Sequence, residues 1–572
     1  MSAAMGEIIT ITNFATKMSQ FSPEASSTLY GLVDMGSNGI RFSISDLALP
    51  TSRALNCIYR ERAGISLYDA LHESTADAKP FHFSPDTIHR VAQTMARFRK
   101  ICDGYGVQQT NTSVFATEAM RTAKNRDEML GAIKEASGLV VDILSPNMES
   151  LFGAMGARSG FHHVDGLFMD LGGGSVQMTY VNSTEHPNYD ILAAEAATSM
   201  PFGAAKLTAA LSTQDEGQAA KKELRSLMKE TFEGLTSRFS RLKQQAEHDD
   251  GITIYFCGGG FRGYGSMLMH TEKMRYPIPA IGGYTTPGER FVKWREMLHV
   301  NKSEEGKIYG LSKRRREQFP AIATVVEALV DAVPKIKQVV FCSGGNREGV
   351  LYMKLPPELR ETNPLSLIPG NVVSDNNAAT DTIVTAIQSG MTKESPAIFS
   401  SEILKYIAHS SWQEMGDRDS ANSAKSLHDP ISGSLAGFPG LTHELRAVIA
   451  LTMCSRWGSD LGPKDKELAE SLQLLIGHEL SFWCRYVGCL VRMLAHVMPA
   501  APVSEEVIHN HILLKPEVTY GLGKKGHKVG IRLRIELGPG ATGLAAGEIE
   551  KYFDKIAKGL KVDWKVEAEV TE

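Results

Sequence analysis

The sequence predicts an α/β protein in which one kind of domain occurs twice, followed by a helical region and a small α+β region. A strand–loop–strand pattern, in which an apolar run ends in an aspartate and turns through glycines, occurs at residues 30–47 and again at 166–181. Between the two patterns, strand and helix signals alternate, as expected for a duplicated α/β domain. The chain has 572 residues, too many for one hydrophobic core, so we expect about three or four domains.

The overall composition is that of an ordinary globular protein. Hydrophobic residues make up 42% of the chain and charged residues 22%, and the net charge of −4 gives no electrostatic footprint for direct nucleic-acid binding. No apolar run reaches transmembrane length, and residues 1–28 lack the features of a signal peptide, so we expect a loose leader there. The seven cysteines form no CxxC pair, which favours reduced thiols in a cytoplasmic protein without membrane contact.

The first strand–loop–strand pattern reads "YGLVDMGSNGIRFSISDL". Its apolar run ends at Asp34, turns through Gly36, Ser37 and Asn38, and continues in a second strand that carries Arg41. Glycine can adopt positive φ and lets backbone amides approach an anion without a Cβ in the way. The loop therefore indicates a phosphate site.

The second pattern reads "GLFMDLGGGSVQMTYV". Here the acid is Asp170, and the loop contains Gly172, Gly173, Gly174 and Ser175. A carboxylate repels phosphate, but it can hold a hydrated Mg²⁺ that bridges to phosphate oxygens. An aspartate beside a glycine loop is thus typical of a metal–phosphate site.

Two further copies of the pattern lack the acid. In "ITIYFCGGGFRGYG" a strand runs into Gly258 and Gly259, and in "QVVFCSGGNREGVLY" a strand runs into Gly344 and Gly345. Glycine turns that open into a helix place free amides at the helix N-terminus, where anions bind. The alternative is four ordinary turns, since Asp and Gly are common in turns; the repetition favours phosphate loops.

The region between the two acid-bearing loops contributes three more candidates. A short strand ends at Thr117, and Arg121 lies four residues later, so both would lie near the first turn of a helix. A second helix begins at Pro146 and carries Glu149 in its first turn, where the helix dipole stabilises a carboxylate. Glu149 could be a helix cap or a catalytic base, and the spacing alone leaves both open.

These residues carry a resemblance that covers residues 28–355. The segments "DMGSNGIR", "FATEAMR", "SPNMES", "FMDLGGGS", "PFGAAKL" and "CSGGNREG" occur in this order. As a set they resemble the exopolyphosphatase and guanosine-pentaphosphate phosphohydrolase family, which has the sugar kinase/Hsp70/actin superfold. The resemblance implies two duplicated actin-like (ribonuclease H-like) domains, at residues 29–165 and 166–365.

The resemblance also implies roles for the site residues. Asp34 and Asp170 would hold Mg²⁺, Arg41 and Arg121 would contact phosphate, and Glu149 would activate the attacking water. The ligand would be a nucleotide (ATP or a guanosine polyphosphate) or polyphosphate, all of which end in the same phosphate group. In bacterial members a glutamate occupies the position of Gln177. Its loss should weaken Mg²⁺ binding, so we expect intact ligand binding and leave turnover open.

A basic run and two C-terminal regions complete the chain. Residues 313–316 read "KRRR", for which we favour a structural or phosphate-facing role over a localisation signal. Residues 371–500 are rich in helix patterns and resemble a degenerate HD-type domain, with Gln413 and Glu414 where a metal-binding His-Asp pair would be. Residues 501–572 suggest an α+β module that is a candidate protein-interaction surface.

The sequence supports two candidate functions. The long C-terminal extension is similar to that of fungal family members with a signalling role, which implies a regulator of mitochondria-to-nucleus (retrograde) signalling and metabolic gene expression. Its partners would be regulatory proteins of that pathway, and a homodimer is a candidate assembly. The alternative is an exopolyphosphatase or a guanosine-polyphosphate hydrolase that uses Glu149 and Mg²⁺.

Overall fold

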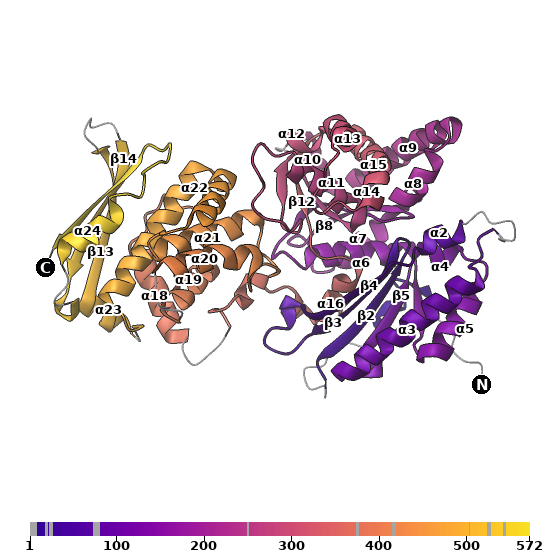
Figure 1. The fold of residues 1–572 in the computed structure, drawn as a ribbon, viewed down its shortest axis with the longest axis horizontal. Coiled ribbons are helices and arrows are strands. Elements are labelled where there is room, and N and C mark those ends of the chain that lie inside the picture. Colours follow the sequence, from indigo (N-terminus) through magenta and orange to yellow (C-terminus); the bar gives the residue numbers. More distant parts are fainter. Residues whose placement is uncertain are drawn as a thin grey trace. The chain divides into compact units, whose positions relative to one another are not determined.

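The structure is a computed structural model that describes residues 8–17, 21, 27–72, 80–248, 251–372, 377–413, 419–502, 504–522, 528–541 and 545–571. It divides into two compact units. The first holds Met1–Lys273 and Ala280–Pro364, and the second holds Met274–Pro279 and Leu365–Glu572. In Figure 1 the first unit runs from indigo to pink and most of the second from orange to yellow.

The first sheet of the first unit has six strands in the order β1-β6-β5-β2-β3-β4. Strands β2, β5 and β6 are parallel, whereas β3 and β4 continue the sheet as antiparallel strands. The bounds are β1 (Ile8–Ile9), β2 (Leu29–Gly36), β3 (Gly39–Asp46), β4 (Asn56–Ala63), β5 (Thr112–Ala116) and β6 (Val141–Leu144). The segment 1–28, expected to be a loose leader, therefore contributes edge strand β1, which pairs with β6.

The second sheet has the order β11-β12-β10-β7-β8-β9 and repeats the topology of the first in five strands, while its edge strand β11 is antiparallel to β12. Strands β7, β10 and β12 are parallel, and β8 and β9 are antiparallel, as in the first sheet. The bounds are β7 (Asp165–Leu171), β8 (Val176–Asn182), β9 (Thr198–Met200), β10 (Ile252–Cys257), β11 (Thr285–Pro287) and β12 (Ile336–Phe341). The predicted duplicated actin-like fold is thus confirmed by the strand order.

Helices connect many of the strands, as in other α/β folds. Up to the end of the first sheet they are α1 (Phe14–Lys17), α2 (Leu67–Leu71), α3 (Pro85–Tyr105), α4 (Glu118–Thr122) and α5 (Arg126–Ser137). Those that follow are α6 (Pro146–Arg158), α7 (Tyr189–Ala196), α8 (Ala204–Ala210), α9 (Gln214–Arg238), α10 (Ser240–Glu247), α11 (Gly258–His270), α12 (Gly288–Phe291), α13 (Trp294–Ser303), α14 (Lys313–Glu317), α15 (Phe319–Ala332), α16 (Asn346–Lys354) and α17 (Pro357–Arg360).

Helices α6 and α16 meet in a glycine seam. A Cβ on Gly156 would overlap the carbonyl of Gly345, and one on Gly344 would overlap the carbonyl of Gly156. One helical turn further on, a Cβ on Gly349 would overlap the carbonyl of Phe152. The start of α16 therefore lies against the end of α6, and the two helices run antiparallel with their backbones in direct contact.

The second unit combines helices with a three-stranded sheet. Its elements are α18 (Asn377–Ser389), α19 (Ser401–Gln413), α20 (Asp419–Ser432), α21 (His443–Arg456), α22 (Pro463–Val497), α23 (Glu505–His511), β13 (Ile512–Leu522), β14 (Lys528–Leu537), α24 (Ala546–Phe553) and β15 (Trp564–Thr571). One hydrophobic cluster runs from α18 through α22 to the sheet, and the expected division at residue 500 stays a prediction. Glu414, of the predicted degenerate pair, lies outside the described residues. Within the described ranges, no helix has both the length and the apolar character needed to cross a membrane.

The seam can be tested with two glycine-to-alanine changes. Gly156→Ala should lower the free energy of unfolding by about 1–3 kcal/mol, because the added methyl overlaps backbone atoms that cannot move aside easily. The matched control is Gly131→Ala in α5, where nothing lies within 4 Å of the added methyl, and it should stabilise by about 0.5–1 kcal/mol. Denaturant unfolding measures both changes; equal effects of the two would contradict the seam.

Candidate functional site

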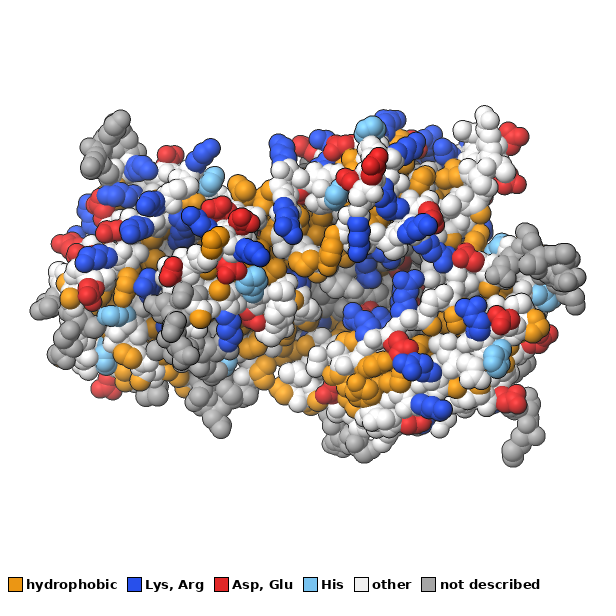
Figure 2. All heavy atoms as spheres, viewed as in Figure 1, with side chains coloured by type: hydrophobic (Ala, Val, Ile, Leu, Met, Phe, Trp, Pro, Cys, Tyr) orange, Lys and Arg blue, Asp and Glu red, His pale blue; other side chains and the backbone are white. Residues whose placement is uncertain are grey.

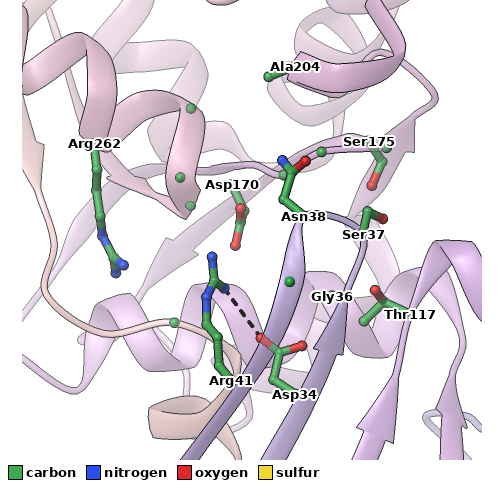
Figure 3. Close-up of a pocket in the computed structure, with 18 of the residues that line it drawn as sticks. Asp34, Gly36, Ser37, Asn38, Arg41, Thr117, Asp170, Ser175, Ala204 and Arg262 are labelled. Atoms are coloured by element: carbon green, nitrogen blue, oxygen red, sulfur yellow. Dashed lines mark hydrogen bonds and ion pairs between the residues drawn. The ribbon is translucent and has the colours of Figure 1, made fainter. Parts of the chain in front are cut away.

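A pocket in the first unit collects most of the residues singled out in the sequence (Figure 3). Its walls are the two hairpin loops, β2–β3 and β7–β8, and the N-terminal turns of α6, α11, α14 and α16. The candidates that line it are Asp34, Gly36, Ser37, Asn38, Arg41, Thr117, Glu149, Asp170, Gly172, Gly173, Gly174, Ser175, Gly258, Gly259 and Gly345. Arg121 and Gly344 are the two candidates that do not line it.

The carbonyl oxygens of the first loop are bonded within its own domain. The Ser37 carbonyl accepts hydrogen bonds from the Tyr68 amide (3.0 Å) and the Ser66 hydroxyl (3.1 Å). The Asn38 carbonyl accepts one from Arg62 (3.1 Å). The amides of Ser37 and Asn38 make no hydrogen bond within the described residues, so they remain available to an anion.

The second loop is held in the same way. The carbonyls of Gly172, Gly173 and Gly174 accept hydrogen bonds of 2.9–3.0 Å from the amides of residues 203–205, where α8 begins. The amides of Gly173 and Gly174 have no partner in the described part of the chain. A Cβ on Gly173 would lie 2.6 Å from Nδ2 of Asn38, so glycine is needed where the two loops meet.

Two aspartates face one arginine between the loops. In Figure 3 the Arg41 guanidinium lies between Asp34 and Asp170, and its Nη1 lies 3.4 Å from Oδ2 of Asp34. Burial raises the pKa of Asp170, whereas the Arg262 and Arg41 guanidinium groups and a hydrogen bond from Cys257 act in the opposite direction. Arg41 therefore supplies positive charge where two acids would otherwise repel an anion.

Glu149 is oriented by an arginine and does not serve as the helix cap. Helix α6 is capped by Ser145, whose hydroxyl accepts a hydrogen bond from the Met148 amide (3.4 Å). The Glu149 carboxylate instead pairs with Arg121, with Nη2 and Oε2 2.9 Å apart. Arg121 also donates to the Leu144 carbonyl (2.6 Å). Arg121, expected to contact phosphate, thus contacts Glu149 in this structure.

The pKa of Glu149 is raised to about 7. Burial is the main cause, and the charges of Asp170 and Asp34 add to it, while Arg121 acts against them. A carboxylate that titrates near neutral pH suits a general base, because it can both take up and release a proton there.

The two acid-free glycine loops differ in what they do. Gly258 has φ +81°, and a Cβ there would overlap Oδ1 of Asp170, so the start of α11 approaches that carboxylate closely. Gly345 lines the pocket, but its amide already donates to Oε2 of Glu348 (3.0 Å). Gly344 lies outside the pocket lining. It belongs to the seam with α6, where its lack of a side chain makes room for Gly156.

Four arginines that were not among the candidates also line the pocket: Arg62, Arg262, Arg314 and Arg315. Figure 2 shows Lys and Arg side chains gathered around the hollow of the first unit. Burial lowers the pKa of Arg315 to about 10, and the charges of Arg262, Arg41 and Arg62 add to this effect. Arg314 and Arg315 belong to the basic run at 313–316, for which the sequence predicted a structural or phosphate-facing role. Single arginines such as Arg62 and Arg262 carried no sequence signal.

Gln177 occupies the equivalent of the Arg41 position in the second hairpin. Arg41 pairs with Asp34 across β2 and β3, and Gln177 pairs with Asp170 across β7 and β8. The Gln177 amide donates to the hydroxyls of Ser175 (2.6 Å) and Ser199 (3.3 Å). Among the described residues, no group of three or more His, Cys, Asp or Glu side chains is arranged to hold a metal ion.

Comparison with known proteins identifies two matching family models. The model of the Ppx/GppA phosphatase family matches residues 48–358, and the model of the RTG2 C-terminal domain matches residues 371–569. Retrograde regulation protein 2 of Saccharomyces cerevisiae is 31% identical over 512 residues, covering 87% of this chain and 85% of the relative. Exopolyphosphatase 1 of Mycobacterium leprae is 24% identical over 57% of this chain and 90% of its own length.

Solved structures of the same kind also match. The Ppx/GppA enzyme of Aquifex aeolicus is 20% identical with a TM-score of 0.43, and the match covers 57% of this chain and 98% of that enzyme. An exopolyphosphatase from Cytophaga hutchinsonii is 19% identical with the same TM-score, over 57% of this chain and 99% of that one.

The raised pKa of Glu149 makes stability depend on pH. Between its ordinary value of 4.5 and about 7, the folded state keeps a proton that the unfolded state has lost, so wild-type stability should fall as pH rises through this window. Glu149→Gln cannot lose a proton. Its unfolding free energy relative to wild type should therefore rise from pH 5 to pH 8 by about 3 kcal/mol. Denaturant unfolding across this range checks the trend; a difference that does not change with pH would contradict it.

Proposed function

The chain belongs to the Ppx/GppA phosphatase family, as its motifs predicted, and on that premise we propose that it is a phosphate-chain-binding regulator of retrograde signalling and metabolic gene expression. The signalling role is supported by the likeness to yeast retrograde regulation protein 2, which extends through the C-terminal domain. One observation carries the binding role: two loops with unbonded amides face a pocket that five arginines line.

The lining of the pocket favours a phosphate chain over a nucleobase as the recognised group. Its described lining residues are glycines, small polar residues, arginines, acids and one alanine, Ala204. Nucleobases are usually held by stacking on aromatic or large apolar side chains, and apart from Ala204 no apolar or aromatic side chain is among the described residues that line this pocket. Inorganic polyphosphate is therefore the preferred ligand, and ATP or a guanosine polyphosphate would bind through its phosphates.

Magnesium fits the site only together with a bound phosphate. Asp34 and Asp170 would hold the hydrated ion, as one or two carboxylates commonly do when substrate phosphates complete the shell. When bound, the ion would spread the negative charge of the terminal phosphates. Asp34 is already paired with Arg41, and Gln177 offers a neutral amide beside Asp170. We therefore propose weak Mg²⁺ binding that depends on the phosphate chain.

The second candidate function is hydrolysis of a phosphoanhydride, favoured by the position and pKa of Glu149. Its carboxylate would accept the proton of a water whose oxygen attacks the terminal phosphorus. The bond to the bridging oxygen would then break, and the shortened chain would leave with that oxygen. Arg121 would orient Glu149, and the loop amides would hold the terminal phosphate. The protein partners and the cytoplasmic location remain part of the proposal.

Binding and turnover can be separated with one variant. Wild type should bind tripolyphosphate and release little or no phosphate from polyphosphate, ATP or guanosine tetraphosphate with Mg²⁺. Glu149→Ala should keep the binding, because the amides and arginines carry it. Calorimetry measures binding and a phosphate-release assay measures turnover. Release by wild type that disappears in Glu149→Ala would assign the hydrolase function, and a failure of all phosphate chains to bind would overturn the regulator proposal.

Gln177→Glu should restore a carboxylate beside Asp170. We expect Mg²⁺ to bind at least about tenfold more tightly in the presence of tripolyphosphate, because a third negative charge would face the ion. The matched control is Gln177→Ala, which removes the amide without adding charge and should not tighten Mg²⁺ binding. Titration with Mg²⁺ at saturating tripolyphosphate measures the effect; the same Mg²⁺ affinity in both variants would show that this position does not limit the metal.

A further inference from the structure

Three consecutive arginines of α14 have three different environments. Arg316 donates to the carbonyls of Asn301, Glu304 and Gly306, at distances of 2.6–2.9 Å, and so supports the loop before the helix. The Arg315 guanidinium lines the pocket and makes no hydrogen bond or ion pair within the described residues. Arg314 also lines the pocket, but its guanidinium is already engaged by the opposite domain.

Arg314 bridges the two actin-like domains. Its Nη2 lies 2.8 Å from Oδ2 of Asp69, 2.9 Å from Oδ1 of Asn38 and 3.0 Å from Oγ of Ser66. Helix α14 follows the second hairpin loop in the chain, whereas its three partners belong to the first loop and to α2 of the first domain. The contact therefore spans the cleft that holds the pocket.

Nη2 of Arg314 has more acceptors within reach than it has hydrogens to donate. A guanidinium Nη carries two hydrogens, whereas three acceptors lie within hydrogen-bond distance of Nη2 of Arg314. Asn38 and Ser66 are neutral, and Ser66 in turn donates to the Ser37 carbonyl, so these two contacts steady the phosphate loop. Asp69 is the charged partner, and its side chain is 54% exposed. Exposed ion pairs of this kind are weak, so a stronger anion can replace the carboxylate.

We propose that Asp69 is an internal competitor for Arg314, and that a phosphate chain in the pocket takes this arginine from Asp69. The inference rests on the proposed function, since it needs a phosphate chain at this site. Phosphate oxygens match the planar guanidinium in pairs and carry more charge than one carboxylate. Arg314 is then a positioning residue in the free protein, where it holds Asn38, and a ligand contact in the bound protein. Release of Asp69 would report occupancy to α2.

The local charge supports this exchange. Burial lowers the pKa of Arg62, and the neighbouring charges of Arg41 and Arg314 add to the effect. Asp69 is the carboxylate that offsets Arg314 at this side of the pocket. Without it, the arginines would repel one another more and attract a polyanion more strongly.

The test is a double-mutant cycle on tripolyphosphate binding, measured by calorimetry at constant ionic strength in the full chain. Asp69→Asn keeps the shape of the side chain and removes its charge, so affinity should rise about threefold to tenfold. Arg314→Ala should lower affinity by at least about fivefold. In the Arg314→Ala background, Asp69→Asn should change affinity less than about twofold, because the competition no longer exists. The control is Lys313→Ala. Lys313 is next to Arg314 in the chain, but its side chain is exposed and lies outside the pocket, so loss of its positive charge should change affinity less than about twofold.

Two outcomes would overturn the inference while leaving the proposed function intact. One is unchanged or weaker binding by Asp69→Asn, in a variant whose thermal unfolding matches wild type. The other is an equal effect of Asp69→Asn with and without Arg314, which would mean that Asp69 acts by general repulsion alone. If wild type fails to bind tripolyphosphate and longer polyphosphate, the proposed function fails, and this inference fails with it.

Discussion

The contact between the backbones of α6 and α16 is the constraint on which the site depends. Gly156 and Gly344 let the two helices touch without intervening side chains. Within α6, a Cβ on Gly153 would lie 3.3 Å from Oδ2 of Asp170 and 3.4 Å from Oδ1 of Asn346. A bulkier seam would therefore push α6, the helix that carries Glu149, away from α16 and from Asp170. The catalytic-type carboxylate and the anion loops share one pocket because glycines allow this approach.

Charge balance is the second organising feature. Burial alone would favour neutral acids, and it raises the pKa values of both Glu149 and Asp170. Arginines oppose this trend at each acid, through Arg121 at Glu149 and through Arg262 and Arg41 at Asp170. The arginines of the pocket outnumber its three acids, so the lining carries more positively than negatively charged side chains. The anionic chain of the proposed function would balance this charge, whether or not the chain is then cleaved.

The two hairpins share their backbone geometry but differ in the side chain opposite the aspartate. They are equivalent in strand order and register, yet one places Arg41 opposite its aspartate and the other places Gln177 there. The loops depend on backbone amides and on carbonyls tied to α2 and α8, which a change at position 177 leaves in place. Metal support depends on side-chain charge, and position 177 places a neutral amide beside Asp170. Under the proposed function, the anion loops would therefore keep their ligand even where metal support is weak.

The sequence by itself determined the duplicated α/β fold, the four glycine loops and most residues of the pocket, because strand periodicity and turn chemistry are local properties. It did not decide whether Glu149 is a helix cap or a catalytic base. The tertiary structure shows that Ser145 caps the helix and that Glu149 pairs with Arg121. Only the tertiary structure separated Gly344, which makes room for α6, from the loop glycines that line the pocket. The tertiary structure also determined which residues Arg314 contacts. Each of these depends on which distant segments come into contact, and that is set by packing across the domains, which no local pattern encodes.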